Sequence, residues 1–212
     1  MKPTDRVRWV YASQSNTELA RRYDAWAASY DHDLVDIFGR VVLEPFVELV
    51  LARTRPAMRI LDAGAGTGLV GAYLHQQGYG GLVAMDLSAG MLAEARKTGA
   101  YRALHQMTLG EPLDFDDDHF DAIIASGVFT EGHAPPRAFA ELIRVTRPGG
   151  LILFTLQPRL YSPGPFGPPL EQLVAEGRWT LLERGEPYQA LPLAEPDILL
   201  EAWCFQVNPQ HP

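Results

Sequence analysis

Apolar and polar residues change their spacing along the chain, and the change divides it near residue 57. Before that point apolar and aromatic residues recur every three or four positions, which predicts a helix capped by Ser15 or Asn16 and a second at about 34–53. After it the pattern predicts short buried strands at 59–63, 81–86, 101–106, 120–126 and 151–156, separated by helices at 67–77, 88–98 and 136–146. Strands that alternate with helices form a parallel sheet covered on both faces, so we expect an α/β fold.

The alternation stops after residue 156. Residues 157–170 contain five prolines and two glycines, too many for a regular element, and long loops of this kind tend to be functional lids. Beyond them we expect a short helix near 169–176 and strands near 179–185 and 199–207. These two strands are expected to pair as an antiparallel hairpin.

The turn after the first expected strand is the most informative stretch. It reads Ile60-Leu61-Asp62-Ala63-Gly64-Ala65-Gly66-Thr67-Gly68. Three alternating glycines cannot continue a strand, so the chain turns there with its backbone open to a ligand. The third glycine comes one position too early for the dinucleotide fingerprint G-x-G-x-x-G. The Asp62 carboxylate would repel a pyrophosphate, but it suits a ligand with an ammonium and a sulfonium group. Asp86 ends the next strand, at the distance where an acid binds ribose hydroxyls.

Further motifs follow in a recognisable order. Phe120-Asp121 opens the fourth strand, and Arg144-Val145-Thr146-Arg147-Pro148-Gly149-Gly150 precedes the fifth. With the glycine turn and Asp86, they resemble the class I S-adenosylmethionine-dependent methyltransferases over nearly the whole chain, although Thr108 stands where that family commonly has aspartate. Tyr23–Asp31 together with Gly127–His133 is similar to the subfamily of the Williams-Beuren-region methyltransferase-like proteins.

The resemblance implies a Rossmann-like fold with a seven-stranded, mostly parallel sheet, helices on both faces and an N-terminal helical cover. We expect one domain over 1–212. Its parts are a helical cover at 1–56, a cofactor-binding core at 57–156, a lid loop at 157–170 and a C-terminal hairpin region at 171–212.

The resemblance also implies that S-adenosylmethionine is the cofactor and S-adenosylhomocysteine its product. Asp86 would bind both ribose hydroxyls, Asp62 would orient the amino-acid end, and Leu87 and Met91 would pack on the adenine. The backbone of Ser126 and Gly127 would contact the methionine part. The expected cofactor-binding residues are Tyr30, Asp62, Gly64, Ala65, Gly66, Gly68, Asp86, Leu87, Met91, Met107, Thr108, Ser126, Gly127 and Val128.

Some candidate site residues can also be explained as ordinary parts of the hydrophobic core or of the surface. Tyr23, Trp26 and Tyr30 share one helix face, and such a stripe is more often core than site. His133 follows the fourth strand, where it is either a solvated loop histidine or a general base. Glu131 and Tyr161 are weaker catalytic candidates. Many acceptors of a methyl group need no base, because the sulfonium is already activated.

Composition narrows the possible partners. The chain has 212 residues, 18 basic and 26 acidic, and the net charge of −8 without basic clusters argues against nucleic acid. Its single cysteine, Cys204, excludes an internal disulfide and a cysteine zinc site. His32, His75, His105 and His119 are not spaced as metal ligands, so we expect no metal. The sequence contains no apolar run of membrane-spanning length, and a cytoplasmic monomer or homodimer is expected.

Three functions remain to be compared. The first is methyl transfer to an oxygen or nitrogen atom of a small molecule. The second is a regulatory protein that binds S-adenosylmethionine or S-adenosylhomocysteine without catalysis. The third is an NAD-dependent oxidoreductase, which needs a different glycine spacing and a Tyr-x-x-x-Lys or equivalent motif. That motif is absent, because Ala27 follows Tyr23 and His105 follows Tyr101 at the position where lysine would stand.

Overall fold

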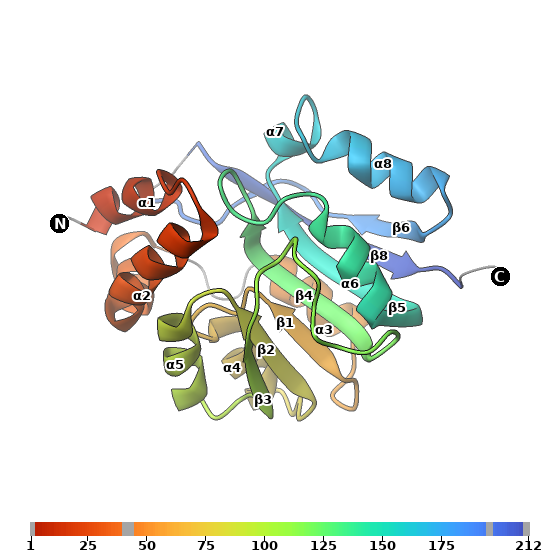
Figure 1. Ribbon diagram of the computed structural model, residues 1–212, viewed down its shortest axis with the longest axis horizontal. Coiled ribbons are helices and arrows are strands. Elements are labelled where there is room, and N and C mark those ends of the chain that lie inside the picture. Colours follow the sequence, from red (N-terminus) through yellow and green to blue (C-terminus); the bar gives the residue numbers. More distant parts are fainter. Residues whose placement is uncertain (1–2, 40–44, 194–196, 210–212) are drawn as a thin grey trace.

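A single twisted sheet forms the centre of the computed structural model, which describes residues 3–39, 45–193 and 197–209 (Figure 1). The strand order is β3-β2-β1-β4-β5-β8-β6, with the short β7 paired to β8. The strands are β1 (Ile60–Ala63), β2 (Leu82–Asp86), β3 (Ala103–Gln106), β4 (Phe120–Phe129), β5 (Thr146–Leu156), β6 (Trp179–Arg184), β7 (Tyr188–Gln189) and β8 (Leu199–Val207).

The first five strands of this order pair in parallel, and β8 pairs antiparallel with β5 and β6. The predicted seven-stranded sheet and its antiparallel hairpin are therefore confirmed, with β7 as an addition. The two residues of β7 are too few to show a strand pattern in sequence.

Helices lie on both faces of the sheet. They are α1 (Pro3–Tyr11), α2 (Asn16–His32), α3 (Pro45–Arg53), α4 (Leu69–Gln76), α5 (Ala89–Lys97), α6 (Ala138–Val145), α7 (Pro158–Tyr161) and α8 (Gly167–Ala175). Ser15 and Ser88 cap α2 and α5 through their side-chain oxygens, as the sequence predicts. No helix among the described residues has both the length and the apolar content needed to cross a membrane.

The central strands are mostly apolar because both of their faces are covered. Along β4, Ile123 and Ala125 belong to the hydrophobic cluster under α6, α7 and α8. Their neighbours Ala122 and Ile124 belong to the cluster under α3 and α4. Alternate residues of one strand thus supply both layers of the core.

Two predicted segments differ from the structure. The helix expected over 34–53 is a π-helical turn at Asp33–Ile37 followed, after residues 40–44 outside the described part, by α3. Gly39 adopts a left-handed φ of 71°, which an α-helix cannot contain. The segment 157–170, expected to lack regular structure, contains α7 and the start of α8. Prolines fit the first turn of a helix, and Leu160 and Phe166 are buried in the main core, so this segment is a fixed part of the fold.

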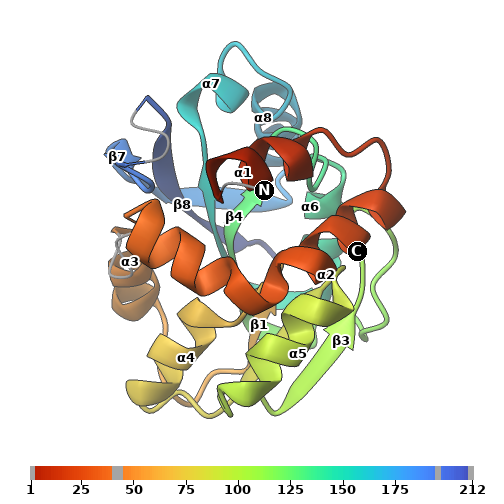
Figure 2. The same ribbon diagram turned by 90° about the vertical axis from the view of Figure 1, so that its left-hand side faces the viewer.

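The helical cover has a small core of its own. Trp26 packs there with Leu19 and Phe38, and the cluster is completed by Val7, Val10 and Leu34. The buried Asp33 carboxylate accepts a hydrogen bond from Trp26 Nε1 at 2.7 Å and pairs with Arg6 at 2.6 Å. In Figure 2, α1 and α2 cross in front of the ends of the sheet strands.

The cover is joined to the rest of the fold at the start of α5. One Asp24 oxygen accepts hydrogen bonds from Ser88 Oγ at 2.6 Å and from the Gly90 amide at 2.7 Å. A β-carbon at Gly90 would lie 2.8 Å from Asp24 Cα, so only glycine allows α2 to come this close.

Because the cover has a separate core, we expect Trp26→Ala to loosen it without unfolding the sheet. Removing a buried tryptophan costs about 3–5 kcal/mol. Amide hydrogen exchange should therefore speed up by about a hundredfold in α2 and stay unchanged in β4 and β5. Phe139→Ala, in the main core, is the control and should speed exchange throughout. Equal acceleration in α2 and β4 after Trp26→Ala would show that the cover and the sheet share one core.

Candidate functional site

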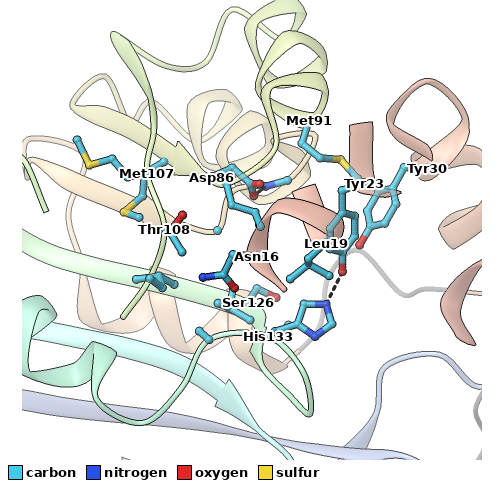
Figure 3. A pocket seen from close by; sticks show the side chains of 18 residues that line it. Asn16, Leu19, Tyr23, Tyr30, Asp86, Met91, Met107, Thr108, Ser126 and His133 are labelled. Atoms are coloured by element: carbon cyan, nitrogen blue, oxygen red, sulfur yellow. Dashed lines mark hydrogen bonds between the residues drawn. The ribbon is translucent and has the colours of Figure 1, made fainter. Parts of the chain in front are cut away.

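A cavity lies between the carboxyl ends of β1, β2 and β4 and the inner face of α2 (Figure 3). Strand order reverses between β1 and β4, and open α/β sheets bind ligands at such a point. The cavity holds about 690 Å³ of space including its open mouth. Its lining residues are Asn16, Leu19, Tyr23, Tyr30, Gly64, Gly66, Met85, Asp86, Leu87, Met91, Met107, Thr108, Leu109, Ser126, Gly127, Val128, His133 and Ala134.

The glycine turn after β1 forms one wall. Gly64 has no room for a side chain, because a β-carbon there would lie 2.5 Å from Val128. Gly66 faces open space, with no atom within 4 Å of where a β-carbon would stand. The turn therefore presents bare backbone to the cavity, as its sequence predicts.

Asp86 ends β2 at the adjoining wall and is 6% exposed. Its two oxygens accept hydrogen bonds of 2.9 Å from the amides of Gly66 and Ser88. Burial raises the pKa of Asp86 to about 6, against the opposing effect of these amides. The Leu87 amide also hydrogen-bonds this carboxylate and lowers its pKa. A carboxylate has about four acceptor positions, so one remains for a hydroxyl group in the cavity.

A second hollow of about 360 Å³ adjoins the first and shares Tyr30, Gly64, Gly66 and Ser126 with it. Its other lining residues are Asp62, Ala65, Thr67, Leu69 and Val70. Thr67 Oγ1 donates to Asp31 of the cover, which fixes the rim of this hollow. The two hollows form one elongated site with a carboxylate in each.

Tyr101 holds Asp62 in place through a 2.6 Å hydrogen bond from its hydroxyl. The ring reaches Asp62 because Gly68 and Gly71 lack side chains: β-carbons there would lie 2.9 Å and 2.0 Å from Tyr101. The third glycine of the turn thus makes room for a positioning residue.

His133 stands at the end of the loop after β4. Its Nδ1 lies 3.0 Å from the Glu131 carbonyl oxygen and 2.9 Å from Thr130 Oγ1, and its Nε2 lies 2.7 Å from the Tyr23 hydroxyl. Since a carbonyl only accepts, Nδ1 carries the hydrogen and Nε2 of the neutral ring accepts from Tyr23. Burial lowers the pKa of His133, so the ring is neutral at neutral pH.

Comparison with known proteins agrees with this geometry. Residues 61–154, from β1 to β5, match the protein family described as "Methyltransferase domain". Human methyltransferase-like protein 27 is 37% identical over 160 residues, which are 72% of this chain and 64% of that protein. The chain belongs to the class I methyltransferases. It spans less than two thirds of its human relative's length.

Solved structures share the fold of this methyltransferase. The [4+2]-cyclase SpnF has a TM-score of 0.71 at 18% identity, covering 92% of this chain and 97% of that chain. Magnesium protoporphyrin IX methyltransferase from Synechocystis PCC 6803, solved with bound S-adenosylmethionine, has a TM-score of 0.60 at 16% identity, covering 96% and 90%. At these identities the likeness concerns the fold.

The structure gathers most of the predicted site residues of the methyltransferase around the two hollows. Gly68 lies outside the lining, at the start of α4. Glu131 and Tyr161, the weaker catalytic candidates, also lie outside it. The Glu131 carboxylate pairs with Arg159 at 2.9 Å, and the Tyr161 hydroxyl donates to Glu171 at 2.9 Å.

Sequence analysis missed part of the lining. Leu19 and Asn16 come from the first turn of α2, and Tyr23, whose place on the aromatic stripe suggested core, reaches His133. No local pattern marks Asn16. Five further lining residues directly adjoin predicted positions and could have been found by extending each motif by one residue: Met85, Leu109 and Ala134 in the first hollow, and Thr67 and Leu69 in the second. Val70, also in the second hollow, lies two residues beyond Gly68. Among the described residues no group of three or more histidine, cysteine, aspartate or glutamate side chains could hold a metal.

The raised pKa of Asp86 predicts how ligand affinity depends on pH. Hydroxyl groups need an ionised carboxylate as acceptor, so binding of S-adenosylhomocysteine should weaken as pH falls through about 6. Calorimetric titration should show a loss of about tenfold at one pH unit below that pKa. Asp86→Asn, which cannot ionise, should bind more weakly at neutral pH and with a flat profile over the same range. A wild-type affinity independent of pH would place the hydroxyl contacts elsewhere.

Proposed function

We propose that this methyltransferase transfers the methyl group of S-adenosylmethionine to an oxygen or nitrogen atom of an uncharged small molecule. The observation that supports it most directly is that Asp86, the glycine turn and the Tyr23–His133 pair line one cavity. A ribose-binding acid and a proton-accepting pair are thus available to the same bound molecule.

The residues present fit this cofactor. Gly66 leaves space beside its backbone, Asp86 keeps an acceptor position for a ribose hydroxyl, and Leu87, Met91 and Met107 offer apolar surface for an adenine. Asp62, held by Tyr101, is placed in the adjoining hollow to receive an ammonium group. When bound, the sulfonium supplies an activated methyl group. The chain's own part is to orient the two reactants, exclude water beneath α2 and accept a proton at the His133 side.

The charge of the lining favours an uncharged acceptor. No described residue lining either hollow is a lysine or arginine, whereas Asp62 and Asp86 are both there. Arg159, on the neighbouring α7, is paired with Glu131. A carboxylate or phosphate acceptor would meet only negative charge on these walls, and this repulsion would be strong in a site of low dielectric.

A second candidate is a protein that binds the cofactor without transferring its methyl group. The structural neighbour described as a [4+2]-cyclase supports keeping it, because that protein shares the fold and bears the name of a different reaction. Binding of the cofactor with no turnover of any acceptor would favour this second candidate.

The proposal is tested by two measurements on the purified protein. Calorimetry compares S-adenosylmethionine with NAD, and saturable binding of the first alone is expected. A panel of phenols, amines, carboxylic acids and phosphate esters is then scored for formation of S-adenosylhomocysteine. Turnover should be confined to the phenols and amines. Methylation of the acids in preference would contradict the uncharged acceptor.

His133→Ala should lower kcat by about a hundredfold or more on the acceptor found in this panel, because a general base is typically worth 10² to 10⁴. Affinity for S-adenosylhomocysteine should change little. In the wild type, burial lowers the pKa of His133, so kcat should fall only on the acid side of about 6.5, the ordinary histidine value. His75→Ala, on the exposed side of α4, is the control. Equal losses of affinity and kcat in His133→Ala would make the residue a structural one.

A further inference from the structure

Both ring nitrogens of His133 already have partners inside the protein. Nδ1 is engaged by the Glu131 carbonyl and Thr130 Oγ1, at 3.0 and 2.9 Å. Nε2, the nitrogen able to accept a proton, is 2.7 Å from the hydroxyl of Tyr23. An acceptor could reach Nε2 directly only by displacing Tyr23.

Neighbouring aromatic rings enclose the imidazole further. The Tyr11 ring of α1 packs against it edge to face at 5.0 Å between centroids, and the Tyr23 ring lies at 5.8 Å. The Tyr23 ring packs in turn against Trp26, stacked at 6.4 Å, and Tyr30, edge to face at 6.2 Å, which also contact each other. These aromatic contacts hold the Tyr23 hydroxyl beside His133.

Tyr23, by contrast, remains able to accept. It lines the cavity together with His133, and Figure 3 shows its hydroxyl pointing at the imidazole. A hydroxyl that donates its hydrogen to Nε2 still has two lone pairs on oxygen. Burial, with the nearby Tyr30 hydroxyl, raises the pKa of Tyr23 well above its ordinary value, so the group stays protonated unless its hydrogen is replaced as it leaves.

Resting on the proposed function, we propose that Tyr23 is the catalytic residue that contacts the acceptor and that it relays the acceptor's proton to His133. As the acceptor oxygen or nitrogen bonds to the methyl carbon, the carbon–sulfur bond breaks and its electron pair stays on sulfur. The acceptor's proton moves to the Tyr23 oxygen while the hydrogen of Tyr23 moves to His133 Nε2. The products are the methylated acceptor, S-adenosylhomocysteine, a neutral tyrosine and an imidazolium that later loses its proton to water.

The relay makes a prediction about His133 that needs no acceptor. Side-chain nitrogen NMR of the full chain should show the neutral ring with its hydrogen on Nδ1. In the wild type, the hydrogen bond from the Tyr23 hydroxyl to Nε2 stabilises the neutral form of His133. Tyr23→Phe keeps the aromatic ring but removes this donor, so the pKa of His133 should rise. The groups that face this pair are Tyr11 from α1, Tyr30 from α2 and Asp86 from β2, and the Glu131 carboxylate beside it is paired with Arg159. A hydrogen on Nε2, or an unchanged His133 titration in Tyr23→Phe, overturns the proposal.

The catalytic role is tested with two uncharged acceptors that differ in whether a proton must be removed. Phenol loses a proton when its oxygen is methylated, whereas N,N-dimethylaniline has no proton on its nitrogen to lose. Tyr23→Phe should lower kcat by about a hundredfold for phenol and by less than about threefold for N,N-dimethylaniline. Tyr73→Phe on α4 removes a tyrosine hydroxyl away from the cavity and should leave both rates unchanged. The Tyr23→Phe/His133→Gln double variant should be no slower on phenol than the slower single variant, because both act on one proton path.

The outcomes separate this proposal from the proposed function. Methylation of both acceptors at wild-type rates by Tyr23→Phe overturns the relay alone. Equal losses with both acceptors make Tyr23 a positioning residue and also overturn it. If the wild type binds S-adenosylmethionine but methylates no member of the panel, the proposed function fails and the relay fails with it.

Discussion

A line of hydrogen bonds through Asp86 joins the parts from which the site is built. The Asp86 carboxylate accepts from Gly66, in the turn after β1, and from Ser88, at the start of α5. The Ser88 hydroxyl accepts from the Met91 amide and donates to Asp24 of the cover. One buried acid and one serine therefore set the distances between the glycine turn, the second strand and α2. The raised pKa of Asp86 shows that burial acts against the ionised form that this arrangement uses.

The cavity lies where the sheet and the cover meet, and each of these two parts has its own hydrophobic core. The sheet and its helices bury a large core on each face, whereas the cover packs a small core of its own around Trp26 and Phe38. Where these bodies meet, hydrogen bonds join Asp24 to Ser88 and Gly90, Asp31 to Thr67, and Tyr23 to His133, and Leu87 packs against the core of the cover. Hydrogen bonds at the boundary between the cover and the sheet can be exchanged for hydrogen bonds to water at little cost in free energy, whereas exposing an apolar core to water is strongly unfavourable. This boundary is therefore where the fold can hold a ligand.

The features that could be predicted from the sequence are those encoded by a short local pattern. Buried strands such as β1 and β4, the caps at Ser15 and Ser88, the bare backbone at Gly66 and the acid at Asp86 could all be found in this way, because each is encoded within a few residues. Contacts between distant residues could not. Tyr23 meets His133 across 110 positions and Tyr101 meets Asp62 across 39, and neither pair leaves a pattern along the chain. The segment with α7 was misjudged because proline was taken as a breaker, although it fits the first turn of a helix.

The order of the cover in the chain has a consequence for biogenesis. On the ribosome α1 and α2 emerge before the sheet, their partners Thr67, Ser88 and His133 are made later, and β6 can join the sheet only when β8 arrives to lie between it and β5. The cover can gather Leu19 and Trp26 into its own small core before the sheet exists, but its hydrogen bonds to Thr67, Ser88 and His133 cannot form until then. The pocket therefore forms only when α2 meets residues that are made much later in the chain.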